Sequence, residues 1–430
     1  MGRTNQSTVL SALSCPYFVP TCFGVYFLLR AGLISLVPID QHSDSLWYHD
    51  RAVALASGQG YSQDGVFTAF WPVGWPGFLG LLYWVFGRSA FVGQITNLML
   101  AAVTFLLALR LGSAIFADRI VGRLTVLILT FYPNQIGYVP SLTSEVFYTA
   151  LLLLAVFVIA RDQRLTRLIL CGILFGVATL TKAQTLLVPA ALFAGWWLLG
   201  RQRERFISHV RKAAVAYLAM AVVILPWTVR NYIVFGQFVL ISTNGGATLL
   251  TGNNPSAQGD YTQDDPLVRR VPFGVVRQVE ADRLATSLAL SWIRDNPGAF
   301  AILIPEKVWR LWAPDGESEW AYQSGFKHYD EHVVLFRFVR GLNQLYYACL
   351  MVLFALSALP FLRQRNTLSP YAGTGYILAA YFTGISVVFS GQSRFHFPLM
   401  PYISMCAAWM IAQWMRRSAR AVALPSRVSA

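Results

Sequence analysis

The chain has 430 residues, of which 56% are hydrophobic and only 13% are charged. A water-soluble protein of this composition would have too little polar surface to cover itself. The net charge of +14 would suit a nucleic-acid partner, but the basic residues gather in short connections between apolar runs, where the positive-inside rule places them in the cytoplasm. The composition therefore predicts an integral membrane protein with no nucleic-acid partner.

The apolar runs predict helices, because they are continuously apolar and do not alternate as the strands of a closed barrel would. Many of them reach the roughly 20 residues that a helix needs to cross the hydrocarbon. With every basic cluster in the cytoplasm, we expect an all-α polytopic protein with about ten crossings and both termini inside. The expected crossings are 16–38, 89–110, 120–138, 144–160, 166–182, 184–200, 213–235, 336–362, 370–390 and 396–415. The basic clusters are Arg110, Arg119 and Arg123; Arg161, Arg164 and Arg167; Arg201, Arg203, Arg205, Arg211 and Lys212; Arg363 and Arg365; and Arg416, Arg417 and Arg420.

The apolar block 72–87 is expected not to cross. If it crossed, every later loop would change side and the arginine clusters would face outward. We therefore predict a re-entrant or interfacial helix that opens with Pro72 and Pro76. The chain then divides into an N-terminal membrane module (1–235) with a first external loop (39–71), an external segment (236–335), and a C-terminal three-span block with a short cytoplasmic tail (336–430).

The external segment 236–335 is predicted to contain two helices. Apolar residues recur at helical spacing from about 275 to 293, which indicates an amphipathic helix. The stretch AFAILIPEKVWRLW is expected to lie in the membrane interface, with Trp309 and Trp312 at headgroup level.

Four acids in the first external loop stand out on this apolar and basic chain: Asp40, Asp44, Asp50 and Asp64. Carboxylates at a membrane boundary usually have a function. Structural explanations are also available: Asp44 as a helix N-cap, Asp50 as the partner of Arg51 in a solvated pair, and Asp64 as a turn residue. The sequence alone does not rank Asp40, Asp44 and Asp50.

A metal site is the other interpretation of this loop. Together with His42 and His49 the acids would supply ligands for a divalent ion, but no fixed ligand spacing supports one. The five cysteines lie in or beside apolar spans, without zinc spacing or a disulfide framework. We therefore predict no metal site and no cofactor, with a divalent metal as the alternative.

Three cations lie on the predicted external side, against the charge rule: Lys182 in the short TKAQ turn, Arg394 in GQSRFHFP, and Arg230, beside Asn231, at the end of the seventh crossing. A cation in such a position calls for a counter-anion and usually marks a ligand pathway. For Lys182 the alternative is a side chain that snorkels to the outer headgroups.

Five further residues are candidates for substrate binding, each with a structural alternative. Glu145 either orients a cation or the acceptor, or is only a first-turn acid favoured by the helix dipole. His396 either donates to a phosphate or is a packed, hydrogen-bonded histidine. Asn253 and Asn254 either bind sugar hydroxyls or build the turn at Pro255. Trp71 either stacks on a sugar or prenyl chain or belongs to an interfacial aromatic belt.

The motifs SDSLWYHDRAVALASGQGY, TAFWPVGWPGFLGLLY, SLTSEVF, TKAQTLLVP, PWTVRNYIVFGQFVLISTNGG, TGNNPSAQGDY and GQSRFHFPLMPY follow one another in the chain. In this order they resemble bacterial membrane glycosyltransferases of the GT-C superfamily, in particular the group related to protein O-mannosyltransferases and aminoarabinose transferases. The resemblance covers nearly the whole chain. It departs from the family at the C-terminus, where those proteins have larger extramembrane regions and this chain has only a short tail.

The resemblance implies a GT-C-like fold and transfer of a sugar, with inversion, from a polyprenyl-phosphate donor on the external face of a bacterial plasma membrane. It implies that Asp44 is the general base, and that Lys182, Arg230 and Arg394 hold the donor phosphate. The acceptor would be a lipid, a glycan or a protein, recognised by the segment 236–335 and the first loop.

Two other functions remain as alternatives. A non-catalytic transporter or flippase of polyprenyl-linked sugars would share the cations and the lipid route, but such proteins usually show internal repeats and helices broken near mid-membrane. A surface-polysaccharide polymerase or ligase would catalyse a neighbouring reaction with a larger donor.

Overall fold

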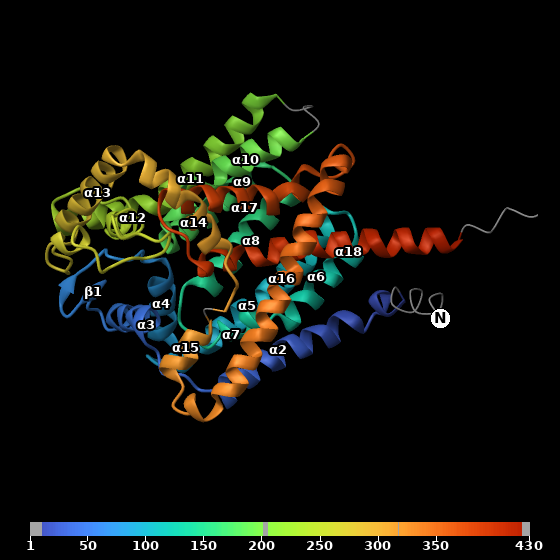
Figure 1. Ribbon diagram of the computed structural model, residues 1–430, viewed down its shortest axis with the longest axis horizontal. Helices are drawn as coiled ribbons and strands as arrows, with labels where there is room; N and C mark the ends of the chain where they lie inside the picture. Colours follow the sequence, from blue (N-terminus) through green and yellow to red (C-terminus); the bar gives the residue numbers. More distant parts are fainter. Residues whose placement is uncertain (1–10, 201–204, 317, 424–430) are drawn as a thin grey trace, which may run out of the picture.

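The computed structural model describes residues 11–200, 205–316 and 318–423, and the chain is built almost entirely from helices (Figure 1). Within the described residues the sheet is limited to one antiparallel pair, β1 (Ser62–Gln63) and β2 (Val66–Phe67). The predicted all-α class is confirmed.

Six helical segments of the described chain are long and apolar enough to cross a membrane, so the protein is an integral, multi-pass membrane protein. They contain α2 (Phe18–Leu36), α5 (Ala90–Ile115), α11 (Phe206–Phe235), α16 (Val333–Gln364), α17 (Thr374–Val388) and α18 (Met400–Ala423).

Four shorter helices occupy the remaining predicted crossings. A 13-residue helix such as α6 is only about 20 Å long, less than the hydrocarbon thickness of about 30 Å. The count of ten crossings therefore stays a prediction. These helices are α6 (Arg119–Phe131), α8 (Glu145–Arg161), α9 (Leu165–Thr181) and α10 (Val188–Leu199), the last preceded by the 3-10 helix η1 (Ala183–Leu187).

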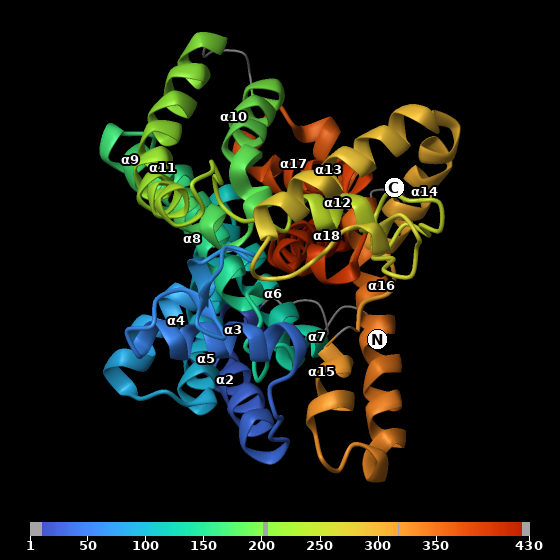
Figure 2. The same ribbon diagram turned by 90° about the vertical axis from the view of Figure 1, so that its left-hand side faces the viewer.

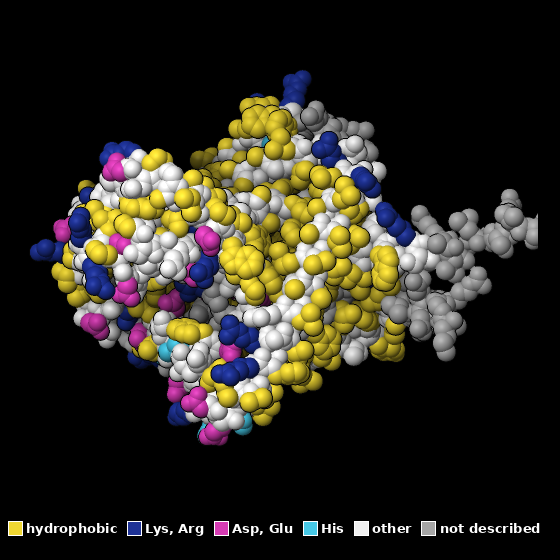
Figure 3. All heavy atoms as spheres, in the orientation of Figure 1, with side chains coloured by type: hydrophobic (Ala, Val, Ile, Leu, Met, Phe, Trp, Pro, Cys, Tyr) yellow, Lys and Arg dark blue, Asp and Glu magenta, His cyan; other side chains and the backbone are white. Residues whose placement is uncertain are grey.

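The membrane helices differ in burial. Of the apolar window that includes α18, 83% is buried inside the protein, against 22% for those of α2 and α16. Helix α18 therefore lies at the centre of the bundle, whereas α2 and α16 present apolar side chains outward. On the face drawn in Figure 3, hydrophobic side chains cover the middle of the molecule, and acidic ones gather at one end of its long axis.

That end carries the segments outside the membrane bundle, and the described chain ends lie toward the opposite end (Figure 1). We call it the extramembrane side. It contains α3 (Ser43–Ala56), the β1–β2 hairpin and α4 (Gly74–Phe86) from the first part of the chain. A Cβ atom on Gly74 would lie 2.4 Å from Thr181 Oγ1, so the absence of a side chain lets α4 begin directly against the end of α9.

Most of the segment 236–335 forms a second group of helices on the extramembrane side. In Figure 2, which looks onto this side, α12 (Gly245–Thr251), α13 (Gln278–Asp295) and α14 (Pro297–Trp312) are grouped together and lie apart from α3 and α4. A small apolar core that includes Leu250, Val271 and Ala285 joins α12 to α13. The fourth helix of the segment, α15 (Ser318–Gly325), lies away from this group, beside α7 (Pro133–Gly137).

Two details differ from the sequence predictions. Both expected helices of this segment are present as α13 and α14, and Trp309 is exposed, but Trp312 stacks on a buried histidine ring and does not reach outward. The last span continues as helix to Ala423, and the rest of the predicted tail lies outside the described residues, as do Arg201 and Arg203. The remaining short elements are η2 (Val268–Arg270), η3 (Asp330–His332), η4 (Pro370–Gly373) and η5 (Ser393–Leu399).

Candidate functional site

Asp44 lies in the first turn of α3 and is not its N-cap. The cap residue is His42, whose backbone N–H donates to Ser45 Oγ at 3.1 Å. The capping interpretation of Asp44 is therefore wrong, because the helix begins two residues earlier than that interpretation needs. Its carboxylate instead accepts a hydrogen bond from Arg394, with 2.7 Å between Asp44 Oδ2 and Arg394 Nη1.

Arg394 approaches from η5, a segment 350 positions further along the chain. Its Nε donates to Gln392 Oε1 at 2.9 Å, which fixes the plane of the guanidinium. The Arg394 side chain is 33% exposed and that of Asp44 is 22% exposed. An ion pair with this much access to solvent is able to exchange partners when a competing anion arrives.

A second ion pair joins Glu145, the first residue of α8, to Lys182, which follows the last residue of α9. Lys182 Nζ donates to Glu145 Oε1 at 3.0 Å, and the two side chains are 15% and 3% exposed. Lys182 therefore points to an internal acid and does not snorkel outward. Glu145 has both proposed roles, since it opens a helix and also orients a cation.

The two ion pairs are neighbours. The ring of Phe395 lies 6.0 Å from Lys182 Nζ and 5.5 Å from the guanidinium carbon of Arg394, and Arg394 also interacts electrostatically with Glu145. We call Asp44, Arg394, Glu145 and Lys182 the charge cluster. It combines two carboxylates and two cations from four distant parts of the chain.

Aromatic side chains border the charge cluster. Trp71 contacts Trp47 and Tyr48 of α3, with ring centroids 4.7 Å and 5.5 Å apart. Burial, together with the carboxylates of Asp44 and Glu145, raises the pKa of Tyr48 above its ordinary value. Tyr48 therefore stays protonated at neutral pH and keeps a hydroxyl donor beside the two acids. Sequence analysis missed Tyr48, because within α3 it is only one of several aromatic residues.

The other acids of the first loop lie elsewhere. Asp40 and Asp50 are exposed, so of the three acids that the sequence did not rank, the half-buried Asp44 is the one in the charge cluster. Asp64 has a φ of 51° and precedes Gly65 with a φ of 78°. Two such residues form the turn of a tight hairpin, which confirms the turn interpretation of Asp64.

Arg230 supports this hairpin from α11. Its guanidinium donates to the carbonyl oxygens of Thr68 and Tyr61, at 2.9 Å and 3.0 Å, and to Asn231 Oδ1 at 3.0 Å. It also lies over the ring of Trp227, 4.7 Å from the centroid. Of the three cations predicted to hold the donor phosphate, the structure thus brings Lys182 and Arg394 together, whereas these contacts of Arg230 are with the hairpin and its surroundings.

Asn253 and Asn254 are fully buried, at 0% and 1% exposure. Their amide groups donate to backbone carbonyls, including those of Leu249 and Leu250 one turn earlier. Asn253 Oδ1 accepts from the buried ammonium of Lys307 at 2.6 Å. Both asparagines therefore build the turn, and the sugar-binding interpretation does not describe them.

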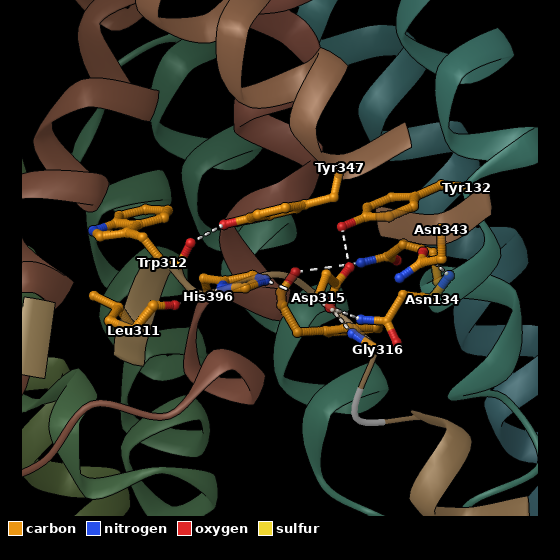
Figure 4. Close-up of polar contacts among 11 residues, drawn as sticks. Tyr132, Asn134, Leu311, Trp312, Asp315, Gly316, Asn343, Tyr347 and His396 are labelled. Atoms are coloured by element: carbon orange, nitrogen blue, oxygen red, sulfur yellow. Dashed lines mark hydrogen bonds and ion pairs between the residues drawn. The ribbon is translucent and has the colours of Figure 1, made fainter. Parts of the chain in front are cut away.

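His396 is also fully buried, at 0% exposure. Its ring lies nearly parallel to those of Trp312 and Tyr347, with centroids 5.9 Å and 5.0 Å away, and its Nε2 lies 3.6 Å from Asp315 Oδ1 (Figure 4). The packed-histidine interpretation is therefore the one that the structure supports. Asp315, at 1% exposure, was not singled out from the sequence, because nothing in its local pattern shows that it is buried.

The loop histidines do not form a metal site with the acids. His49 Nδ1 and Tyr83 Oη lie 2.7 Å apart, and burial lowers the pKa of His49. Within the described part of the chain, no group of three or more histidine, cysteine or acidic residues is arranged to hold a metal ion.

Comparisons with known proteins show which known fold this chain resembles. The family described as dolichyl-phosphate-mannose-protein mannosyltransferase matches residues 72–229, a range that includes Glu145 and Lys182 but neither Asp44 nor Arg394. The archaeal oligosaccharyltransferase AglB from Archaeoglobus fulgidus, in complex with an inhibitory peptide and a dolichol-phosphate, superimposes with a TM-score of 0.56 at 12% identity, covering 96% of this chain and 52% of AglB. The chain has a GT-C-like fold.

The GT-C-like fold that the motifs predicted is thereby confirmed. This GT-C-like chain spans about half the length of AglB. ArnT from Cupriavidus metallidurans, bound to undecaprenyl phosphate, matches with a TM-score of 0.47 at 12% identity over 96% of this chain and 80% of ArnT. A search of curated proteins found no match.

Proposed function

We propose that this protein is a glycosyltransferase that moves a sugar from a polyprenyl-phosphate donor to an acceptor hydroxyl, with inversion at the anomeric carbon. The observation that carries the proposal is the charge cluster, in which a half-exposed Asp44 is paired with Arg394 beside Lys182 and Glu145. It offers a proton acceptor and two cations for a phosphate in one place. The dolichol-phosphate bound to AglB supports the choice of donor.

Donor binding and base activation are coupled in this scheme. In the donor-free arrangement Asp44 Oδ2 is engaged by Arg394 Nη1 at 2.7 Å and is not open to an acceptor hydroxyl. A donor phosphate is a strong competitor for the planar guanidinium of Arg394. When the phosphate takes Arg394, Asp44 Oδ2 becomes free to accept the proton of the acceptor hydroxyl.

The chemical step is then a single displacement. The acceptor oxygen gives its proton to Asp44 and attacks the anomeric carbon from the face opposite the phosphate. The bond between that carbon and the phosphate oxygen breaks, and its electron pair leaves with the polyprenyl phosphate. Arg394 and Lys182 stabilise the charge that develops on the leaving group.

The neighbouring residues support this step. Glu145 keeps Lys182 directed into the cluster through the 3.0 Å contact. Trp71, packed on Trp47 and Tyr48, provides an aromatic surface on which a sugar ring or the prenyl chain stacks. We place the site on the external, periplasmic face of a bacterial plasma membrane, with a lipid, a glycan or a protein as the acceptor.

The experiment compares envelope and lipid-linked glycans from cells that lack the chain with those from cells that carry variants of it. The glycan lost on deletion should return with the wild-type chain and with Asp50→Asn, because Asp50 is exposed in the same loop. It should not return with Asp44→Asn expressed at the same level. Recovery of the glycan with Asp44→Asn would move the base to another residue, and no glycan difference on deletion would contradict the proposed activity.

A further inference from the structure

The buried residues around Asp315 lie on four separate elements. Asp315 follows α14 in the chain. Its carboxylate accepts hydrogen bonds from the hydroxyl of Tyr132, from the side-chain amide of Asn134 and, at 3.1 Å, from the backbone N–H of Gly316 (Figure 4). The side-chain oxygen Oδ1 of Asn343, in α16, accepts a hydrogen bond from the backbone N–H of Asn134 at 3.0 Å. These three donors hold the carboxyl group of Asp315 in one orientation.

His396 of η5 faces this carboxylate. Its Nδ1 is 2.6 Å from the carbonyl oxygen of Leu311, and a carbonyl accepts only, so Nδ1 carries a hydrogen. Nε2 lies 3.6 Å from Asp315 Oδ1. The rings of Tyr347 and Trp312 lie nearly parallel to the imidazole, at 18° and 1°, and pack against it.

The same stretch of chain contacts the first external loop at its other end. In α15, the Gly325 carbonyl accepts the backbone N–H of Asp40 at 2.9 Å. The ring of Trp320 lies 4.6 Å from that of His42, the N-cap of α3. A Cβ atom on Gly325 would lie 2.4 Å from the Asp40 carbonyl oxygen, so the two segments are in close contact just before Asp44.

We propose that Asp315, Gly316 and α15 form a brace that positions Arg394 and Asp44 relative to each other. The buried contact of Asp315 with His396, two residues after Arg394, is its fixed end, and the contacts of α15 hold the start of α3. Asp315 and His396 are positioning residues, since their burial keeps them from touching a substrate. The inference rests on the proposed function of the Asp44–Arg394 pair.

Two isosteric variants test which nitrogen of His396 matters. In His396→Asn the side-chain amide nitrogen takes the place of Nδ1, and in His396→Gln it lies near the place of Nε2. In the purified full chain, His396→Asn should keep the bond to Leu311 and weaken the binding of undecaprenyl phosphate about 3- to 30-fold. His396→Gln, which still reaches Asp315, should lose less affinity. Tyr402→Phe, which removes a buried hydroxyl bonded to Leu152 at 3.0 Å, should bind like the parent.

A double-mutant cycle separates positioning from general destabilisation. In an Arg394→Ala background, His396→Asn should cause no further loss of affinity, because the brace acts through Arg394. Equal losses in both backgrounds, or parental affinity of both His396→Asn and Asp315→Asn, would overturn the brace. Parental affinity of Arg394→Ala alone would instead contradict the proposed phosphate site.

A variant at the other end of the brace covers the case in which the buried variants fail to fold. Trp320 is 50% exposed, so Trp320→Ala should fold while losing its contact with His42. We expect a smaller loss of affinity for undecaprenyl phosphate, again absent in the Arg394→Ala background. Unchanged affinity in folded Trp320→Ala would contradict the role of α15.

Discussion

The Asp44–Arg394 pair and the Asp315–His396 pair each join an acid to a basic side chain, but they differ in their access to solvent. Side chains of the Asp44–Arg394 pair are 22% and 33% exposed, whereas those of Asp315 and His396 are 1% and 0% exposed. A partly exposed ion pair gains little net free energy and changes partners easily, while buried polar groups are costly to separate from their partners. The comparison assigns ligand exchange to the Asp44–Arg394 pair and positioning to the buried pair.

The largest effect expected from this contrast is on transfer. Arg394→Ala removes the cation that holds the leaving phosphate, so sugar transfer should fall by about a thousandfold, in the range known for the loss of one charge-stabilising donor. The apparent unfolding temperature in detergent should hardly change, because the pair is partly exposed. A comparable loss of transfer in Arg269→Ala, which removes an exposed arginine of the same extramembrane side, would mean that the loss does not report on the charge cluster.

A substitution in the buried Asp315–His396 pair should instead have a large effect on stability. Asp315→Ala removes the acceptor of Tyr132 and Asn134 and leaves both donors buried without a partner. We expect a loss of about 2–6 kcal/mol in the free energy of unfolding, at about 1–3 kcal/mol for each unsatisfied buried group. Thermal or denaturant unfolding in detergent measures it, with Asp264→Ala as the exposed control. A loss no larger than that of the control would contradict the burial of this charge.

Lys307 gives a prediction for pH. Burial lowers the pKa of its ammonium from 10.5 to about 8, so between pH 8 and the ordinary pKa the unfolded chain holds a proton that the folded chain has released. The free energy of unfolding should therefore rise with pH across this window. The rise should be smaller in Lys307→Met, measured by unfolding at matched pH values. Parallel pH profiles for the two proteins would contradict the shift.

The smallest effect is expected at Arg230. Because its guanidinium bonds to Tyr61 and Thr68, Arg230→Lys should loosen the hairpin and change the affinity for undecaprenyl phosphate by less than about threefold. Lys182→Met, at the second cation of the charge cluster, should weaken the same binding about tenfold. Equal losses of affinity in the two variants would mean that Arg230 also binds the donor phosphate.

Sequence patterns predicted those features that follow from which side of the membrane a charged residue lies on. Lys182 and Arg394 were found because they break the positive-inside rule, and both lie in the charge cluster. The helices of the membrane bundle and of the extramembrane segment followed from apolar length and helical spacing. Resemblance to a known family, and not spacing, singled out Asp44.

Long-range contacts could not be predicted in this way. Asp44 and Arg394 are 350 positions apart, and no local pattern relates them. Arg230 has the same sequence signal as Arg394, yet its neighbours are backbone carbonyls of the hairpin. The polar character of Asn253 and His396 allowed either a ligand contact or a structural role, and only the fold shows that both are buried with partners within the protein.

The central claim is that a lipid phosphate and Asp44 compete for Arg394. The direct measurement is the affinity of purified Asp44→Asn for undecaprenyl phosphate, compared with the wild-type chain and with Asp50→Asn. Since the competing carboxylate is removed, Asp44→Asn should bind about two- to fivefold more tightly, the worth of a partly exposed ion pair, although it transfers no sugar. Weaker binding by Asp44→Asn than by either reference would contradict the claim.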